Sequence, residues 1–163
     1  MISVDTLKQV ILDNQHDVER HIVIPRSVDL DEGMNYVLVG VRRAGKSFML
    51  YQRMQQNLQQ GIGWDKMLYI NFEDERLINM EASALNLLLE AFARIYANDR
   101  PILFLDELQN VVGWEKFARR LADSKFRVYI TGSNARMLSA EIATTLGGRY
   151  IMKEVYPYSF AEY

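Results

Sequence analysis

The chain has 163 residues, of which 49% are hydrophobic and 25% charged, the composition of a single globular domain. Its 19 basic and 21 acidic residues nearly cancel, so the charge balance does not indicate binding to nucleic acid or to an anionic membrane surface. Because the sequence has no cysteine and two histidines, disulfides and thiolate metal sites are excluded and a zinc cluster is disfavoured.

The sequence carries no sign of export or membrane insertion. Its start lacks the basic residues and apolar run of a signal peptide. The most apolar long stretch, residues 85–97, contains Asn86, Glu90 and Arg94 and falls short of the ~20 apolar residues that a membrane span requires. We therefore expect a soluble, cytoplasmic protein without membrane contact.

An amphipathic helix is predicted at the start of the chain, with Ser3 or Asp5 available to accept its first free amides. Its apolar positions recur at helical spacing, at Leu7, Val10, Ile11 and Val18. A connector follows, because a short β-branched run ends at Pro25 and residues 29–33 are polar and turn-prone. The helix and connector are expected to occupy residues 1–33.

From residue 34 on, short apolar strands alternate with helices up to residue 155. Strands are predicted at 36–40, 67–72, 102–105, 128–130 and 150–155. Helices are predicted between them at 46–60, 85–98, 114–123 and 137–143. Such alternation requires right-handed crossovers, which place helices on both faces of the sheet. The sequence therefore predicts an α/β fold with a mostly parallel, five-stranded sheet at 34–155.

A phosphate-binding motif lies between the first of these strands and the helix that follows it. The pattern G-x-x-x-x-G-K-[ST] is matched without a mismatch by Gly40-Val41-Arg42-Arg43-Ala44-Gly45-Lys46-Ser47. Its glycines let successive amides and the helix N-terminus face a phosphate, Lys46 supplies a mobile positive charge, and Ser47 offers a hydroxyl to Mg²⁺. We predict that residues from Gly40 to Phe48 bind the phosphates of a nucleotide.

Two carboxylates follow the apolar strand at 102–105. Ligands of parallel sheets bind at the carboxyl ends of strands, so Asp106 is expected at the same edge as Lys46, where it would complete a Mg²⁺ site. Glu107 is then placed to orient or deprotonate a water that attacks the γ-phosphate. The alternative interpretation is an ordinary acidic helix start after a buried strand.

The strand at 128–130 is followed by Thr131-Gly132-Ser133-Asn134, so it too delivers polar groups to this edge. Ser133 or Asn134 could contact the γ-phosphate or its water, or could cap the helix that starts at residue 135. Arg149 stands on a glycine-rich turn, where it could reach a phosphate in its own or a neighbouring subunit, or be solvated.

Other charged groups are less informative. One of Arg42 and Arg43 could contact phosphate or a partner. The acidic residues 73–75 could add a metal-shell carboxylate, although such runs are often solvated loops. The basic face formed by Lys116, Arg119 and Arg120 lacks interleaved aromatic residues, so nucleic-acid binding is not indicated.

Taken in order, these motifs resemble those of AAA-like P-loop ATPases, and most closely one prokaryotic group of such ATPases. The segments that carry the resemblance are Gly-Val-Arg-Arg-Ala-Gly-Lys-Ser (40–47), Tyr-Ile-Asn-Phe-Glu-Asp (69–74), Leu-Phe-Leu-Asp-Glu-Leu-Gln-Asn (103–110), Ile-Thr-Gly-Ser-Asn-Ala-Arg-Met-Leu-Ser (130–139) and Gly-Gly-Arg (147–149). Residues 156–163 are similar to the Pro-x-Ser-Phe-x-Glu segment that follows in this group.

The resemblance implies an AAA-like sheet of the additional-strand, catalytic-glutamate type. It implies that Lys46 and Ser47 bind ATP and Mg²⁺, that Asp106 completes the metal site and that Glu107 polarises water. Ser133 or Asn134 would sense the γ-phosphate. It also implies that residues 156–163 begin a further segment and that C-terminal domains, absent from this chain, follow.

Two functional hypotheses remain open from the sequence. The first is an ATPase core whose nucleotide cycle drives or gates a partner or the absent C-terminal domains. The second is a nucleotide-gated binding module with negligible turnover. A GTPase is less favoured because the sequence lacks an Asn-Lys-x-Asp motif after the fourth predicted strand. A small-molecule kinase is less favoured because no basic acceptor lid is visible.

Overall fold

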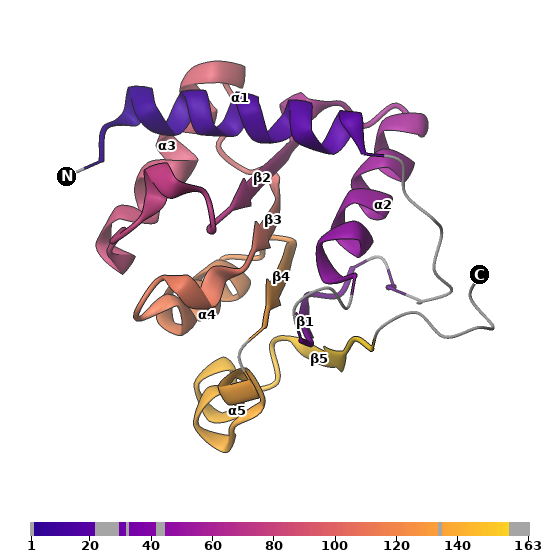
Figure 1. Ribbon diagram of the computed structural model, residues 1–163, viewed down its shortest axis with the longest axis vertical. Coiled ribbons are helices and arrows are strands. Elements are labelled where there is room, and N and C mark those ends of the chain that lie inside the picture. The colour runs from indigo at the N-terminus through magenta and orange to yellow at the C-terminus, as the bar shows by residue number, and fades with distance from the viewer. Residues whose placement is uncertain (1, 22–29, 32, 42–44, 134, 157–163) are drawn as a thin grey trace.

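The computed structural model describes residues 2–21, 30–31, 33–41, 45–133 and 135–156. Within these ranges the strands form one parallel sheet in the order β2-β3-β4-β1-β5 (Figure 1). The strands are β1 (Tyr36–Val39), β2 (Met67–Asn71), β3 (Ile102–Asp106), β4 (Val128–Gly132) and β5 (Ile151–Glu154). The α-helices are α1 (Val4–Arg20), α2 (Lys46–Gln59), α3 (Asn86–Tyr96), α4 (Trp114–Asp123) and α5 (Ala140–Leu146). The predicted α/β fold is confirmed.

The strand order separates β1 from β3 by one strand, β4. Val39 at the end of β1 is in register with Gly132 of β4, and Asn71 at the end of β2 is in register with Asp106. The carboxyl ends of these four strands therefore lie along one edge of the sheet. This is the additional-strand arrangement that the resemblance implies.

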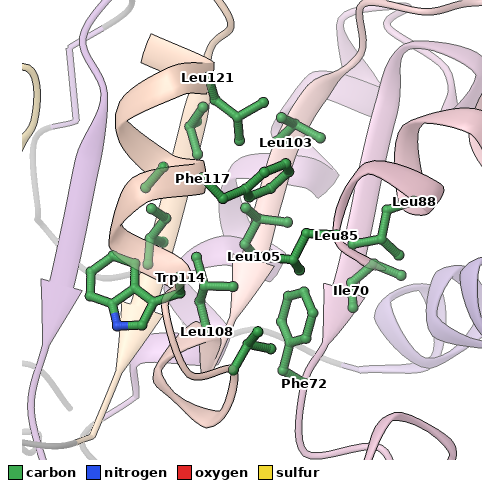
Figure 2. Close-up of a cluster of buried hydrophobic side chains, with 14 of the residues drawn as sticks. Ile70, Phe72, Leu85, Leu88, Leu103, Leu105, Leu108, Trp114, Phe117 and Leu121 are labelled. Atoms are coloured by element: carbon green, nitrogen blue, oxygen red, sulfur yellow. The ribbon is translucent and has the colours of Figure 1, made fainter. Parts of the chain in front are cut away.

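Helices cover both faces of the sheet because successive strand residues point to opposite sides. α2 packs on one face, where the buried strand residues include Tyr36, Leu38, Tyr69 and Phe104. α3, α4 and α5 pack on the other face (Figure 1). Figure 2 shows the centre of that second cluster, which includes Ile70, Leu88, Leu103, Leu105, Phe117 and Leu121.

The N-terminal helix α1 lies along β2 at the edge of the sheet and packs against α3 (Figure 1). Its residues contribute to both apolar clusters, with Ile11 on one side and Val18 on the other. The side-chain oxygen of Asn14 accepts a hydrogen bond from the backbone N–H of Asn71, at 2.8 Å. Ser3 caps the helix by accepting from the amide of Thr6 at 3.1 Å, as one of the two predicted caps.

The largest departure from the predicted elements is the helix expected at 137–143. The structure has a 3-10 helix at Ala135–Leu138 and then α5, which begins after Ser139. The Ser139 side chain accepts from the amide of Ile142, so this N-cap starts α5 at Ala140 and not at Met137. No helix in the described part of the chain is long and apolar enough to cross a membrane.

The position of α1 predicts that Ile11→Ala strongly destabilises the fold. Ile11 is fully buried, so the substitution removes apolar contacts and leaves a cavity, at a cost of about 2–5 kcal/mol in the free energy of unfolding. Lys8→Ala, at a partly exposed position of the same helix, is the control and should change the free energy of unfolding by less than about 0.5 kcal/mol. Urea unfolding followed by circular dichroism measures both, and equal small effects would contradict the packing of α1.

Candidate functional site

The site lies where β1 leads into α2. Gly45 adopts a left-handed conformation, with φ 93°, that glycine accepts without strain, and α2 begins at the next residue. No side chain in the described ranges caps the amino end of α2, so its first amides remain available to an anion. Arg42, Arg43 and Ala44 of the predicted motif lie outside the described residues.

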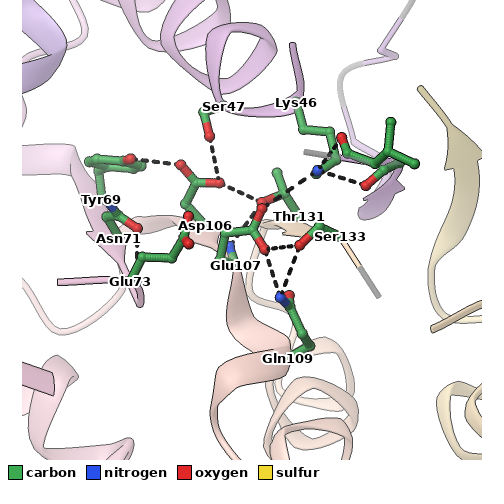
Figure 3. Close-up of polar contacts among 12 residues, drawn as sticks. Lys46, Ser47, Tyr69, Asn71, Glu73, Asp106, Glu107, Gln109, Thr131 and Ser133 are labelled. Atoms are coloured by element: carbon green, nitrogen blue, oxygen red, sulfur yellow. Dashed lines mark hydrogen bonds and ion pairs between the residues drawn. The ribbon is translucent and has the colours of Figure 1, made fainter. Parts of the chain in front are cut away.

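Lys46 is buried, with 4% of its surface exposed, and its ammonium group is fully engaged. Its Nζ donates to the backbone carbonyls of Gly40 at 2.7 Å and Val41 at 3.1 Å (Figure 3). It also lies 3.5 Å from Glu107 Oε1, in an ion pair whose two side chains are 3% and 7% exposed. Each charge is held in the interior because the other offsets the loss of its hydration.

Glu107 is held by contacts to both its backbone and its carboxylate. Its φ of 58° is left-handed, which is unfavourable for a residue with a side chain. Its N–H donates to Thr131 Oγ1 at 2.9 Å. Its Oε2 accepts from Ser133 Oγ at 2.9 Å and from Gln109 Nε2 at 2.7 Å (Figure 3). These contacts fix a carboxylate beside Lys46 at the carboxyl edge of the sheet.

Asp106 is 1% exposed and accepts hydrogen bonds from three hydroxyl groups. Ser47 Oγ and Thr131 Oγ1 donate to its Oδ1, the former at 3.1 Å, and Tyr69 donates to its Oδ2 at 2.8 Å. Burial raises the pKa of Asp106, and these three hydrogen bonds oppose the rise. Burial also raises the pKa of Tyr69 well above its usual range, so this phenol stays a donor.

The pair formed by Ser47 and Asp106 has the donor chemistry that Mg²⁺ requires. A hydroxyl and a carboxylate are hard oxygen ligands, and Mg²⁺ is commonly bound by one or two such groups together with substrate phosphates. Among the described residues no group of three or more His, Cys, Asp or Glu side chains could hold a metal alone. By their donor chemistry, Ser47 and Asp106 fit a Mg²⁺ site whose remaining ligands are phosphate oxygens and water.

Not all of the other predicted residues lie at this site. Ser133 contacts Glu107, while Asn134 lies outside the described residues. Val41 is 63% exposed beside the site, and Phe48 packs edge-on against Tyr51 on the first turns of α2.

Arg149 lies away from this group. It precedes β5, and Tyr36 at the start of β1 is in register with Ile151, so Arg149 stands at the opposite edge of the sheet from Lys46. Its side chain pairs with Asp123 at the end of α4. Among the described residues, the structure therefore does not bring Arg149 near Lys46 of its own chain.

Three residues of the network were not among the predicted site residues. Tyr69 stands within the apolar run of its strand, which is typical of a core aromatic. Thr131 follows an apolar run. Its position at the carboxyl end of a predicted strand is the signal that could have identified it as a site residue. Gln109 follows the two carboxylates within the segment 103–110, but its spacing carries no chemical signature.

The comparison with known proteins agrees with this geometry. An AAA domain family matches residues 33–163, which is most of the chain. The chain belongs to the AAA domain family. Nucleotide binding is the property that membership of this family implies, and the family match begins just before β1 and includes all the residues of the site.

Similar full-length proteins are uncharacterized and much longer. An uncharacterized protein of Methanocaldococcus jannaschii is 42% identical over 158 residues, which cover 96% of this chain and 34% of that protein. An uncharacterized protein of Haemophilus influenzae is 42% identical over 130 residues, covering 78% of this chain and 32% of that protein. The chain thus spans about a third of the length of these relatives.

The raised pKa of Asp106 predicts that Asp106→Asn stabilises the nucleotide-free fold. A buried acid with a raised pKa costs stability above its folded pKa, and the cost disappears below the unfolded value of 3.8. We expect the melting temperature at neutral pH to rise, and the gain to shrink as the pH falls toward the unfolded value.

Differential scanning calorimetry across this pH range measures the effect. Asp74→Asn is the matched control, because hydrogen bonds from Arg76 hold the pKa of Asp74 below its usual value. This control should lower the melting temperature at neutral pH. A lower or unchanged melting temperature for Asp106→Asn would show that the buried carboxylate carries no cost.

Proposed function

We propose that this chain binds ATP and hydrolyses it in a Mg²⁺-dependent reaction. The observation that carries the proposal is the buried ion pair between Lys46 and Glu107, which adjoins the contact between Ser47 and Asp106. Burying two charges is costly unless each is paired with the other or with a ligand. At one edge of the sheet, the arrangement supplies a cation that can bind phosphate, oxygen ligands that can bind a metal, and a carboxylate that can accept a hydrogen bond from water.

Phosphate binding is assigned to Lys46 and the amino end of α2. The Nζ of Lys46 is held by two backbone carbonyls and Glu107, all of them groups that a phosphate oxygen can replace as partners of an ammonium. The free amides of α2 and the helix dipole favour the same anion. Nucleotide binding would therefore separate Lys46 from Glu107 and leave Glu107 Oε1 open.

Mg²⁺ is assigned to Ser47 and Asp106. When bound, the ion neutralises charge that develops on the phosphates during transfer. The hydroxyls of Tyr69, at Oδ2, and of Thr131, at Oδ1, help to hold the Asp106 carboxylate in one orientation. We propose that these hydroxyls oppose the rise in the pKa of Asp106 and keep its carboxylate aimed at Ser47.

Glu107 is assigned as the general base that orients or deprotonates the attacking water. Such a base needs a carboxylate oxygen within hydrogen-bond reach of the water, and Oε1 meets this need once Lys46 turns to phosphate. Ser133 binds the other oxygen and is our candidate γ-phosphate sensor.

We further propose that the nucleotide cycle drives or gates a partner or the C-terminal domains of a longer protein, as the greater length of the relatives supports.

Lys46→Ala should abolish ATP binding because it removes the cation of the site. Isothermal titration calorimetry with Mg-ATP and Mg-GTP measures this, on samples whose melting curves show that they are folded. Lys66→Ala is the matched control, since Lys66 is exposed and precedes β2 at the opposite edge of the sheet, and it should bind ATP as the wild type does. Equal binding by wild type and Lys46→Ala would refute the site, and tighter binding of GTP would correct the base preference.

Glu107→Gln should retain ATP binding and lose turnover. It keeps the side-chain shape but removes the basic carboxylate, so we expect the kcat for phosphate release to fall at least ~100-fold. Steady-state phosphate release and calorimetric ATP binding are measured on the same samples. Equal, near-zero turnover by both proteins, with ATP binding intact, would favour a nucleotide-gated binding module instead.

A further inference from the structure

Gln109 contacts the Glu107 carboxylate directly from the 3-10 helix Leu108–Asn110. Its Nε2 donates to Glu107 Oε2 at 2.7 Å and lies 3.4 Å from Ser133 Oγ (Figure 3). Because a carboxylate only accepts hydrogen bonds, the amide nitrogen must face Glu107 and the amide oxygen must face away. That oxygen is buried and has no hydrogen-bond partner among the described residues.

The unpaired oxygen indicates what the amide contributes. A buried polar atom without a partner costs stability, and a methionine would fill similar space without this cost. Gly132 leaves room for the amide, since a Cβ there would lie 2.8 Å from Gln109 Oε1 and 1.7 Å from Met137 Sδ. The favourable contact that the amide gains in return is its hydrogen bond to Glu107.

This hydrogen bond also helps to set the orientation of the Glu107 carboxylate toward Lys46. Oε2 is held from two directions, by Ser133 and by Gln109. Oε1 is consequently the oxygen that faces Lys46, at 3.5 Å. Without the donor of Gln109, the carboxylate would keep Ser133 at Oε2 and Lys46 at Oε1. Once Lys46 turns to phosphate, as proposed above, only the Ser133 hydroxyl would oppose rotation about the terminal torsion of Glu107.

We infer that Gln109 is a positioning residue, which fixes Glu107 Oε2 so that Oε1 faces the phosphate-binding lysine. This inference rests on the proposed role of Glu107 in hydrolysis. It assigns to Gln109 a part in the rate of turnover and no part in nucleotide affinity. A misplaced carboxylate lowers kcat because the attacking water is no longer aligned.

The kinetic test compares Gln109→Met with the wild type in phosphate release. We expect kcat to fall about tenfold or more, with KM for ATP and the calorimetric affinity unchanged within about twofold. In the Glu107→Gln background the same substitution should cause no further loss, because Gln109 acts through Glu107. Gln109→Glu, which replaces the donor by an acceptor, should lose at least as much turnover. Gln59→Met, at the exposed end of α2, is the matched control.

A spectroscopic measurement tests the contact without hydrolysis. The side-chain amide signals of Gln109, assigned in a ¹⁵N spectrum by their loss in Gln109→Met, should move in Glu107→Gln. They should stay in place in Glu141→Gln, a matched change at an exposed glutamate of α5. Signals that fail to move in Glu107→Gln would overturn the inference.

The two proposals fail in different ways. Turnover that depends on Glu107 but is normal in both Gln109 variants overturns the positioning role and leaves the proposed function intact. A loss that is equally large in the Glu107→Gln background also overturns it, since it would show that Gln109 acts independently of Glu107. Turnover that is unaffected by Glu107→Gln overturns the proposed function, and the positioning role with it.

Discussion

The buried ion pair of Lys46 and Glu107 is the interaction on which the arrangement of the site depends. Both groups are almost fully buried, and neither charge would be stable there without a partner of opposite sign. The loop carbonyls of Gly40 and Val41 share the ammonium, while Ser133 and Gln109 share the carboxylate. A ligand that competes for one member of the pair therefore also changes the surroundings of the other.

The strand order sets the separation of the two backbone segments that carry this pair. Lys46 follows β1 and Glu107 follows β3, and β4 lies between these strands. Adjacent strands are about 4.8 Å apart, so the two backbones are separated by about 10 Å, which two long side chains can bridge. β4 and the residue that follows it supply short hydroxyl side chains at this point, Thr131 and Ser133. Thr131 contacts Asp106 and the backbone of Glu107, and Ser133 contacts the Glu107 carboxylate.

The sequence predicts the strands, most helix limits and the residues of the phosphate motif, because apolar runs and glycine spacing are local signals. The same rule for parallel strands that brings Asp106 to Lys46 places Arg149 at the opposite edge, since Arg149 precedes its strand. The hydroxyl contact of Tyr69 could not be predicted, because it depends on β2 lying beside β3. The direction of Gln109 depends on the left-handed backbone of Glu107, which a glutamate does not signal.

Helix α1 has a consequence for where this domain begins. The family match begins at residue 33, yet α1 precedes it and covers β2, whose last N–H is bound by Asn14. The M. jannaschii relative is similar over nearly the whole chain, so its match extends into this helix. A protein cut at the family boundary would expose β2 as an open sheet edge that can pair with another copy. Soluble, monodisperse samples of this core should therefore depend on including the first twenty or so residues.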